Sequence, residues 1–368
     1  MELISKNLVR SFVCLAILAL GSCTQATVAP TIAPTNPPDP TATIQPTALP
    51  EPTALPEPTA LPEPTALPEP TSAPAAEASS VTLNIPLAVF LDPAGRIYLT
   101  DVDNRLIRMD DLAGTNLAVF GSTGSEQGQF NFPIGFFVDT SGKIYIADSG
   151  NNRIVCIDDM SGKNWTTFGS TGSGKGQLSN PEWVFVDPNG KIYITDTGNN
   201  RIVRIDDMSG SNWITYGSQG SGKGQFNYPI GLFVDAQGKI YVADGDNQRI
   251  VRMDDMQGTN WISYGTIGTG VGQFNKVPDV FKGPQHVVVD SIGKIYISDA
   301  GNTRIVRIED MTGANWTTFG APGEGLGQLN GSVGIFVDSL GKIYFADSWN
   351  NRLVRIDDMS GAGWTTYP

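Results

Sequence analysis

The sequence repeats one unit six times. An Ile-Tyr pair recurs at intervals of 47, 48, 48, 55 and 48 residues. The six isoleucines are Ile97, Ile144, Ile192, Ile240, Ile295 and Ile343. A period of this length indicates a repeat architecture, in which each unit buries its apolar faces against its neighbours. Any fold for this chain must therefore be built from a unit of about 48 residues.

Each copy has the pattern of four short β-strands. In the second copy these are residues 135–139, 143–148, 153–159 and 164–169. The first two are apolar on consecutive residues, so both faces of the sheet must be covered. Short Asp- and Gly-containing turns join the strands as antiparallel hairpins. The pattern predicts an all-β fold, a six-bladed β-propeller of four-stranded blades over residues 81–368.

Four features of the second copy resemble the NHL repeat. They are the Gly-rich lead at 128–131, an apolar strand ending in Asp139, the "IYIAD" strand at 144–148 and the "NNRI" segment at 151–154. The resemblance covers residues 81–368 and implies a propeller whose default role is binding a protein partner. Amidating lyases that resemble NHL proteins hold zinc with several histidines, whereas this chain has only His286. Their zinc site is therefore not carried over.

The first 80 residues are predicted to export and anchor the propeller. Residues 1–22 have a basic start and an apolar run too short for a stable span, as in a signal peptide. The run ends in Leu-Gly-Ser-Cys23, which resembles a lipobox, so Cys23 is expected to be lipidated. Residues 23–80, rich in Pro, Thr, Ala and Glu, are predicted to be a disordered linker. We expect a membrane-anchored lipoprotein that faces the periplasm or the cell exterior.

Net charge restricts the partners. The chain has a formal charge of −13 and stays acidic without residues 1–80. Nucleic acid, although bound by some NHL relatives, requires a basic surface and is not expected here.

Polar residues that recur in every copy are expected to be structural. In the second copy these are Asp148, Asn151, Asn152 and Arg153. Asp and Asn would satisfy turn amides, and Arg would bridge neighbouring blades. Function is therefore sought where one copy departs from the others.

The main departures are predicted to share one face, where the interblade linkers lie. Glu182 and Trp183 replace an Ile-Gly pair, and Trp349 replaces a small residue. The fifth linker is seven residues longer and places His286 in a slot that three other copies fill with glycine. Large exposed side chains at the channel mouth favour a binding site. A neutral insertion on which Trp183 merely packs is the alternative.

These departures define the candidate ligand-binding residues. They are Glu182, Trp183, Phe281, Lys282, His286 and Trp349. We expect a monomeric, non-catalytic binding or scaffold module for a protein, peptide or glycan, with no cofactor, metal or catalytic residue. The alternative function is a metal-assisted lyase or hydrolase, with Glu182 and His286 on one divalent ion at the channel mouth.

Overall fold

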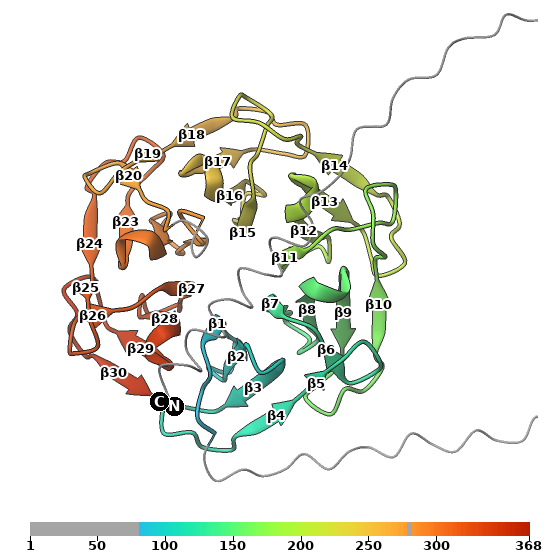
Figure 1. Ribbon diagram of the computed structural model, residues 1–368, viewed down its shortest axis with the longest axis horizontal. Helices are drawn as coiled ribbons and strands as arrows, with labels where there is room; N and C mark the ends of the chain where they lie inside the picture. The colour runs from blue at the N-terminus through green and yellow to red at the C-terminus, as the bar shows by residue number, and fades with distance from the viewer. Residues whose placement is uncertain (1–80, 278–281) are drawn as a thin grey trace, which may run out of the picture.

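The computed structural model describes residues 81–277 and 282–368, which form a ring of six four-stranded antiparallel sheets (Figure 1). Each blade is one continuous segment of chain, and its strands follow one another in sequence order from the axis to the rim. The predicted six-bladed β-propeller is confirmed. The innermost strands of blades 1 to 6 are β1 (Pro86–Leu91), β7 (Pro133–Val138), β11 (Pro181–Val186), β15 (Pro229–Val234), β21 (His286–Val289) and β27 (Ser332–Val337).

Burial decreases from the second strand to the rim. The second strands, almost wholly buried, are β2 (Ile97–Asp101), β8 (Ile144–Asp148), β12 (Ile192–Asp196), β16 (Ile240–Asp244), β22 (Ile295–Asp299) and β28 (Ile343–Asp347). The third strands are β3 (Arg105–Met109), β9 (Arg153–Ile157), β13 (Arg201–Ile205), β17 (Arg249–Met253), β23 (Arg304–Ile308) and β29 (Arg352–Ile356). The short outer strands are β4 (Ala118–Phe120), β10 (Thr166–Phe168), β14 (Ile214–Tyr216), β18 (Ile262–Tyr264), β24 (Thr317–Phe319) and β30 (Thr365–Tyr367).

The two faces of the ring carry different connections. The upper face holds the interblade linkers and, in blades 2 to 6, a 3-10 turn between the second and third strands. These turns are η1 (Ser149–Asn151), η2 (Thr197–Asn199), η3 (Gly245–Asn247), η4 (Ala300–Asn302) and η5 (Ser348–Asn350). Three linkers contain a short parallel pair: β5 (Ser122–Thr123) with β6 (Gln129–Phe130), β19 (Thr266–Ile267) with β20 (Gln273–Phe274), and β25 (Ala321–Pro322) with β26 (Gln328–Leu329). The lower face holds the Asp-Gly turns between the first and second strands.

The recurrent Asp and Arg side chains fix each linker onto its own blade. Asp148 is fully buried. Its carboxylate accepts a hydrogen bond from the Asn131 amide at 2.7 Å and forms an ion pair with Arg153 at 2.7 Å. The same guanidinium donates to the carbonyls of Ser125 and Gln129 in the linker. The ion pair recurs in every blade: Asp101–Arg105, Asp148–Arg153, Asp196–Arg201, Asp244–Arg249, Asp299–Arg304 and Asp347–Arg352.

The bridge to the next blade comes from Asn, not from Arg as the sequence suggested. Asn152 adopts a left-handed conformation (φ 55°), and its Oδ1 accepts the Asn180 amide of the following blade at 2.8 Å. Asn351 closes the ring in the same way by accepting the Ile85 amide at 2.9 Å. Arg fails to reach the next blade because its three nitrogens are engaged by its own Asp and linker.

Each described blade is a separate sheet, and the first and last blades are not joined by a linker as the other neighbours are, so side chains close the ring. The Tyr367 hydroxyl donates to the Val81 carbonyl at 2.8 Å, and the Ser348 hydroxyl donates to the Pro86 carbonyl at 2.7 Å. This junction, between blades 6 and 1, is called the seam below.

Candidate functional site

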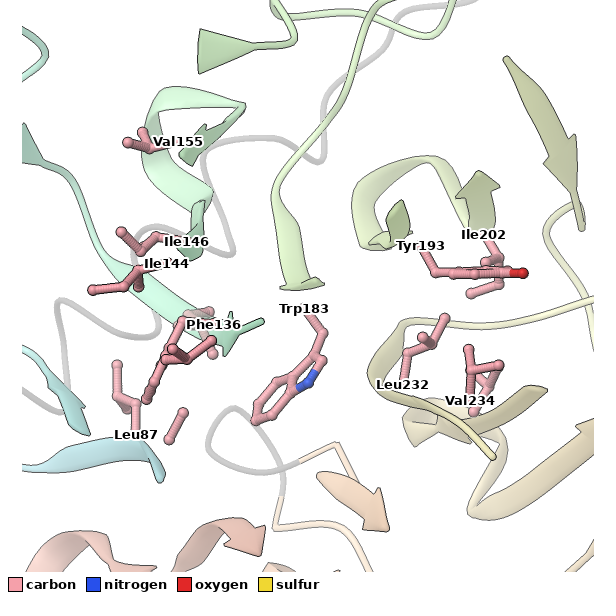
Figure 2. Packing of buried hydrophobic residues seen from close by; sticks show 14 of the residues in the cluster. Leu87, Phe136, Ile144, Ile146, Val155, Trp183, Tyr193, Ile202, Leu232 and Val234 are labelled. Carbon is pink, nitrogen blue, oxygen red and sulfur yellow. The ribbon is translucent and has the colours of Figure 1, made fainter. Parts of the chain in front are cut away.

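Trp183 and His286 meet inside the upper end of the central channel. Their rings stack with centroids 3.8 Å apart and planes at 35°. Figure 2 shows the Trp183 indole extending from β11 into the space between Phe136 of blade 2 and Leu232 of blade 4. Each of the two stacked residues is only 4% exposed. The departures are thus brought together as predicted, but the expectation that these side chains are exposed is wrong.

The burial has a steric cause in the neighbouring blades. A Cβ added at Gly135 would lie 2.5 Å from Trp183 Cδ2, and one added at Gly231 would lie 2.5 Å from His286 Cδ2. The glycines of even-numbered blades therefore make the space that the large residues of odd-numbered blades fill. The two aromatic rings fill this space and are buried rather than exposed to solvent.

Hydroxyl residues on the second strands follow the same alternation. Odd blades pair their larger first-strand residue with a hydroxyl residue, as Ala88–Thr100, Trp183–Thr195 and His286–Ser298. Even blades carry Gly135, Gly231 and Gly334 on the first strand and Ala147, Ala243 and Ala346 on the second. The Thr195 hydroxyl accepts the Trp183 amide at 2.8 Å, and the Ser298 hydroxyl donates to the Val333 carbonyl of blade 6 at 2.6 Å. This alternation is visible in the sequence, and the sequence reasoning missed it.

His286 is held as a neutral imidazole. Its Nδ1 accepts a hydrogen bond from the Ile335 amide of blade 6 at 3.3 Å, which places the ring proton on Nε2. Burial lowers the pKa of His286 to about 3. The imidazole is therefore uncharged at neutral pH and links blades 5 and 6.

Glu182 is a buried carboxyl group, 6% exposed, beside the stack. Its Oε1 accepts hydrogen bonds from the Tyr228 hydroxyl at 2.7 Å and from Asn180 Nδ2 at 3.0 Å. Burial raises the pKa of Glu182 to about 7, while these two donors and the Lys282 charge oppose the rise. Glu182 thus links blade 3 to Tyr228 of blade 4.

The insertion of blade 5 is fixed at both ends by other departures from the repeat. Lys276 and Lys282 place their amino groups 3.9 and 3.8 Å from the Asp246 carboxylate of blade 4. Val277 and the half-buried Trp349 of blade 6 both pack against the buried pair Ala300 and Val333. Asp246 and Trp349 occupy the same slot in η3 and η5, which is glycine in η1, η2 and η4. We call Asp246, Lys276, Val277, Lys282 and Trp349 the insertion patch.

Two of the predicted functional residues cannot be placed. Cys23 and Phe281 lie outside the described residues. Sequence reasoning in turn missed three partners in this region, Asn180, Tyr228 and Asp246. Each stands where its sister copies carry a different residue, so a comparison of the copies position by position would have found them.

The residues at the upper end of the channel do not fit a divalent cation. His286 Nδ1 already accepts an amide, and Glu182 Oε1 already accepts two donors. Within residues 81–277 and 282–368, no group of three His, Cys, Asp or Glu side chains is placed to hold a metal ion. A pair of this kind provides at most two ligands, fewer than such ions usually take from protein.

Three segments, one in each of blades 2 to 4, match the family model of the NHL repeat: residues 130–157, 178–205 and 226–253. The chain carries NHL repeats. The matched segments run from the end of each linker through the third strand, and thus contain the Asp–Arg ion pair of each NHL blade. A comparison with curated proteins found no match.

Solved structures similar to the NHL propeller have different roles. A streptogramin B lyase is 16% identical, with a TM-score of 0.54 over 78% of this chain and 84% of that one. A catalytically inactive virginiamycin B lyase variant from Staphylococcus aureus with quinupristin is 17% identical (TM-score 0.53; 79% and 85% covered). A chain of a nidogen/laminin complex is 17% identical (TM-score 0.54; 76% and 92% covered). At these identities the likeness shows the fold alone.

Proposed function

We propose that this chain is an exported, lipid-anchored NHL propeller that binds a protein, peptide or glycan on its upper face without catalysing a reaction. The observation that carries the proposal is the convergence of departures from the repeat on the blade 5 insertion. Asp246 of blade 4 forms ion pairs with Lys276 and Lys282 of this segment, and Trp349 of blade 6 packs on the same buried pair, Ala300 and Val333, as Val277 does. A loop that had drifted neutrally would not require matching changes in two other blades.

The insertion patch supplies the chemistry of a recognition surface. It combines an aromatic side chain, two ammonium groups and a carboxylate on a rigid ring. Lys282 also lies over the Tyr228 ring, with its Nζ 5.5 Å from the ring centroid. Aromatic anchors surrounded by polar groups are typical of binding hot spots. Glu182 is joined to this surface through Tyr228, whose hydroxyl donates to its Oε1.

A lyase role is not favoured by any residue contact. The streptogramin B and virginiamycin B lyase structures match this chain only in fold. The single histidine of this chain is buried, neutral and hydrogen-bonded to a backbone amide. An active site needs an accessible acid, base or nucleophile. The nidogen/laminin neighbour provides a precedent for partner binding on this fold.

Deletion of the insertion tests the binding role. Removing residues 277–283 from the full-length chain restores the 48-residue spacing of the other copies. Cross-linking in intact cells, followed by mass spectrometry, should recover specific partners with the wild-type chain and at least about tenfold less with the deletion. The matched control is Lys175→Ala/Lys223→Ala, which removes exposed lysines from two other linkers. Equal recovery by the deletion variant would refute the proposed function.

The membrane anchor is tested separately. In cells that are fed a labelled fatty-acid analogue, the wild-type chain should become labelled. It should also be found in the membrane fraction. Cys23→Ser should abolish both properties, whereas Cys14→Ser and Cys156→Ser should retain them. Labelling of Cys23→Ser would refute the anchor. Within the described residues, no helix has the length and apolar character needed to span a bilayer.

A further inference from the structure

The lower end of the channel, opposite the Trp183–His286 stack, opens into a cavity of about 770 Å³. It lies among the ends of the innermost strands and the Asp-Gly turns of blades 1, 2, 3, 4 and 6. Because these turns lie on the lower face, the cavity is accessible from that face. Its volume is within the range of small-molecule sites, which are concave and mostly apolar.

Phenylalanine forms the wall of this cavity. Five innermost strands carry Phe at the same register, and successive ring centroids are 4.7 to 5.2 Å apart. Around the ring these residues are Phe336, Phe90, Phe137, Phe185 and Phe233. All five are half-buried, and four of them line the cavity itself. The five side chains are therefore packed against one another while each leaves part of its ring open to solvent.

Packing alone does not account for this wall. Positions one residue earlier on the same strands, such as Val184 and Leu232, are fully buried between blades. Exposed apolar surface costs roughly 25 cal/mol per Å² relative to burial. A ring whose only role was structural would gain stability by closing over these side chains. The open aromatic wall instead matches a surface that a ligand covers.

The rim of the cavity is acidic. Five turn aspartates line it, and no Lys, Arg or His belongs to the lining: Asp92, Asp139, Asp187, Asp235 and Asp338. Arg96 neutralises Asp92 at 2.6 Å. The other four have no ion-pair partner within the part of the chain that the structure describes. Nearby lysines turn outward, as Lys191 does to Asp206 at 2.6 Å. A positive charge that enters the cavity therefore meets aromatic rings and carboxylates that accept turn amides but are neutralised by no cation of the described residues.

The ring is asymmetric at blade 5, where Val288 stands in the Phe position. An adjoining groove of about 470 Å³ lies between blades 4 and 5 and shares Asp235 and Ala236 with the cavity. Phe233 lines this groove, together with acidic Asp290, Glu309 and Asp310 and basic Lys239 and Arg252. A ligand longer than the cavity has a path outward at this point that is lined by charges of both signs.

We infer that the lower cavity is a binding site for an organic cation with an apolar body, such as a quaternary ammonium or an aromatic amine. Phe faces attract cations through their quadrupole, and the rim carboxylates add direct Coulomb attraction. This site lies at the opposite end of the channel from the insertion patch and does not rest on the proposed function.

Three probes of similar size separate charge from shape. Phenyltrimethylammonium is cationic, tert-butylbenzene is its neutral isostere, and benzenesulfonate is anionic. Titration of the full-length chain, followed by ligand-observed NMR, should give the cation at least about fivefold higher affinity than the neutral probe, and the anion the weakest binding. A cation that binds no tighter than tert-butylbenzene would overturn the inference.

Matched variants locate the site. Asp139→Asn/Asp187→Asn keeps an oxygen acceptor for the turn amides and should weaken cation binding at least about fivefold. It should leave the neutral probe unaffected. Asp159→Asn/Asp207→Asn is the charge control, because these exposed outer-turn carboxylates accept hydrogen bonds from Ser161 and Ser209 and form no ion pair with a lysine of the described residues. Phe185→Leu should weaken the binding of both phenyltrimethylammonium and tert-butylbenzene. Phe168→Leu, on outer strand β10, should leave the binding of both probes unchanged. Equal losses from the outer and inner variants would overturn the assignment.

Discussion

The two ends of the central channel are made by the same six innermost strands, yet they differ. The upper end is filled by side chains, whereas the lower end is open. At the upper end, residues that differ among blades, Trp183 and His286, fill the axis. At the lower end, five blades share a Phe residue at one position, and four of these residues line a cavity. Departure from the repeat therefore does not imply an exposed functional residue. Repetition likewise does not imply a purely structural one, because a symmetric ring can itself make a site.

The largest expected effect compares two aromatic residues on one strand. Trp183→Ala should lower the free energy of unfolding by about 3–5 kcal/mol, because it leaves a cavity in a closed part of the channel. Phe185→Ala, two residues away on a wall that is already open, should cost about 1–2 kcal/mol. Denaturant unfolding of the full-length variants, followed by far-UV circular dichroism, measures both. Equal losses would contradict the contrast between the two ends.

A pH effect of about 3 kcal/mol is expected from Glu182. Its folded-state pKa of about 7 lies above the ordinary value of 4.5. Between these values the folded chain holds a proton that the unfolded chain has lost, so stability falls as pH rises from about 4.5 to 7. Glu182→Gln should remove this decline. The check is the difference between wild-type and variant unfolding free energies across this range; a difference independent of pH would contradict it.

His286 should act in the opposite direction. The folded-state pKa of His286, about 3, lies below the ordinary value of 6.5. The contribution of His286 to the free energy of unfolding is therefore lost as the pH falls from 6.5 through 3. In the wild-type chain the two groups oppose one another between pH 4.5 and 6.5. Glu182→Gln should therefore unmask a rise in stability with pH over this window, and His286→Asn should unmask a fall. The same slope in both variants would be inconsistent with these assignments.

A smaller effect is expected from the stack itself. A double-mutant cycle with Trp183→Leu and His286→Leu should give a coupling of about 0.5–1.5 kcal/mol in unfolding free energy. The control cycle pairs Trp183→Leu with Trp165→Leu, which lies at the outer rim against Phe120. That pair should be additive. Additivity in both cycles would mean that the stacked geometry adds nothing beyond burial.

The smallest effect is expected at the lower rim. Leu340, 79% exposed in the blade 6 turn, should tolerate replacement by Ser within about 0.5 kcal/mol of unfolding free energy. Leu329→Ser is the buried counterpart on β26, with no exposed surface, and should cost several times more. The same denaturant series measures both variants. A large loss from Leu340→Ser would show that the rim is packed rather than open.

The fold was predictable because every blade has the same sequence pattern of strands and turns. Strand lengths, Asp-Gly turns and a period near 48 residues determine the meander, and strand direction assigns each loop to a face. This reasoning correctly gathered Trp183 and His286. It could not give their burial, which depends on space left by Gly135 and Gly231 in other blades. The lower cavity escaped notice because its Phe residues recur, and because the change to Val288 is small.

The seam determines how the ring responds to mechanical load. Blades 1 and 6 are joined by no linker, and their junction is held by side-chain hydrogen bonds such as Tyr367–Val81 and by a shared apolar cluster that includes Leu83 and Leu353. Tension applied to the chain at Val81 acts first on the Tyr367 hydrogen bond and then on this apolar contact. Under a pulling force, the ring should therefore open between blades 6 and 1. Blade 1 should detach first, while the other five blades stay assembled.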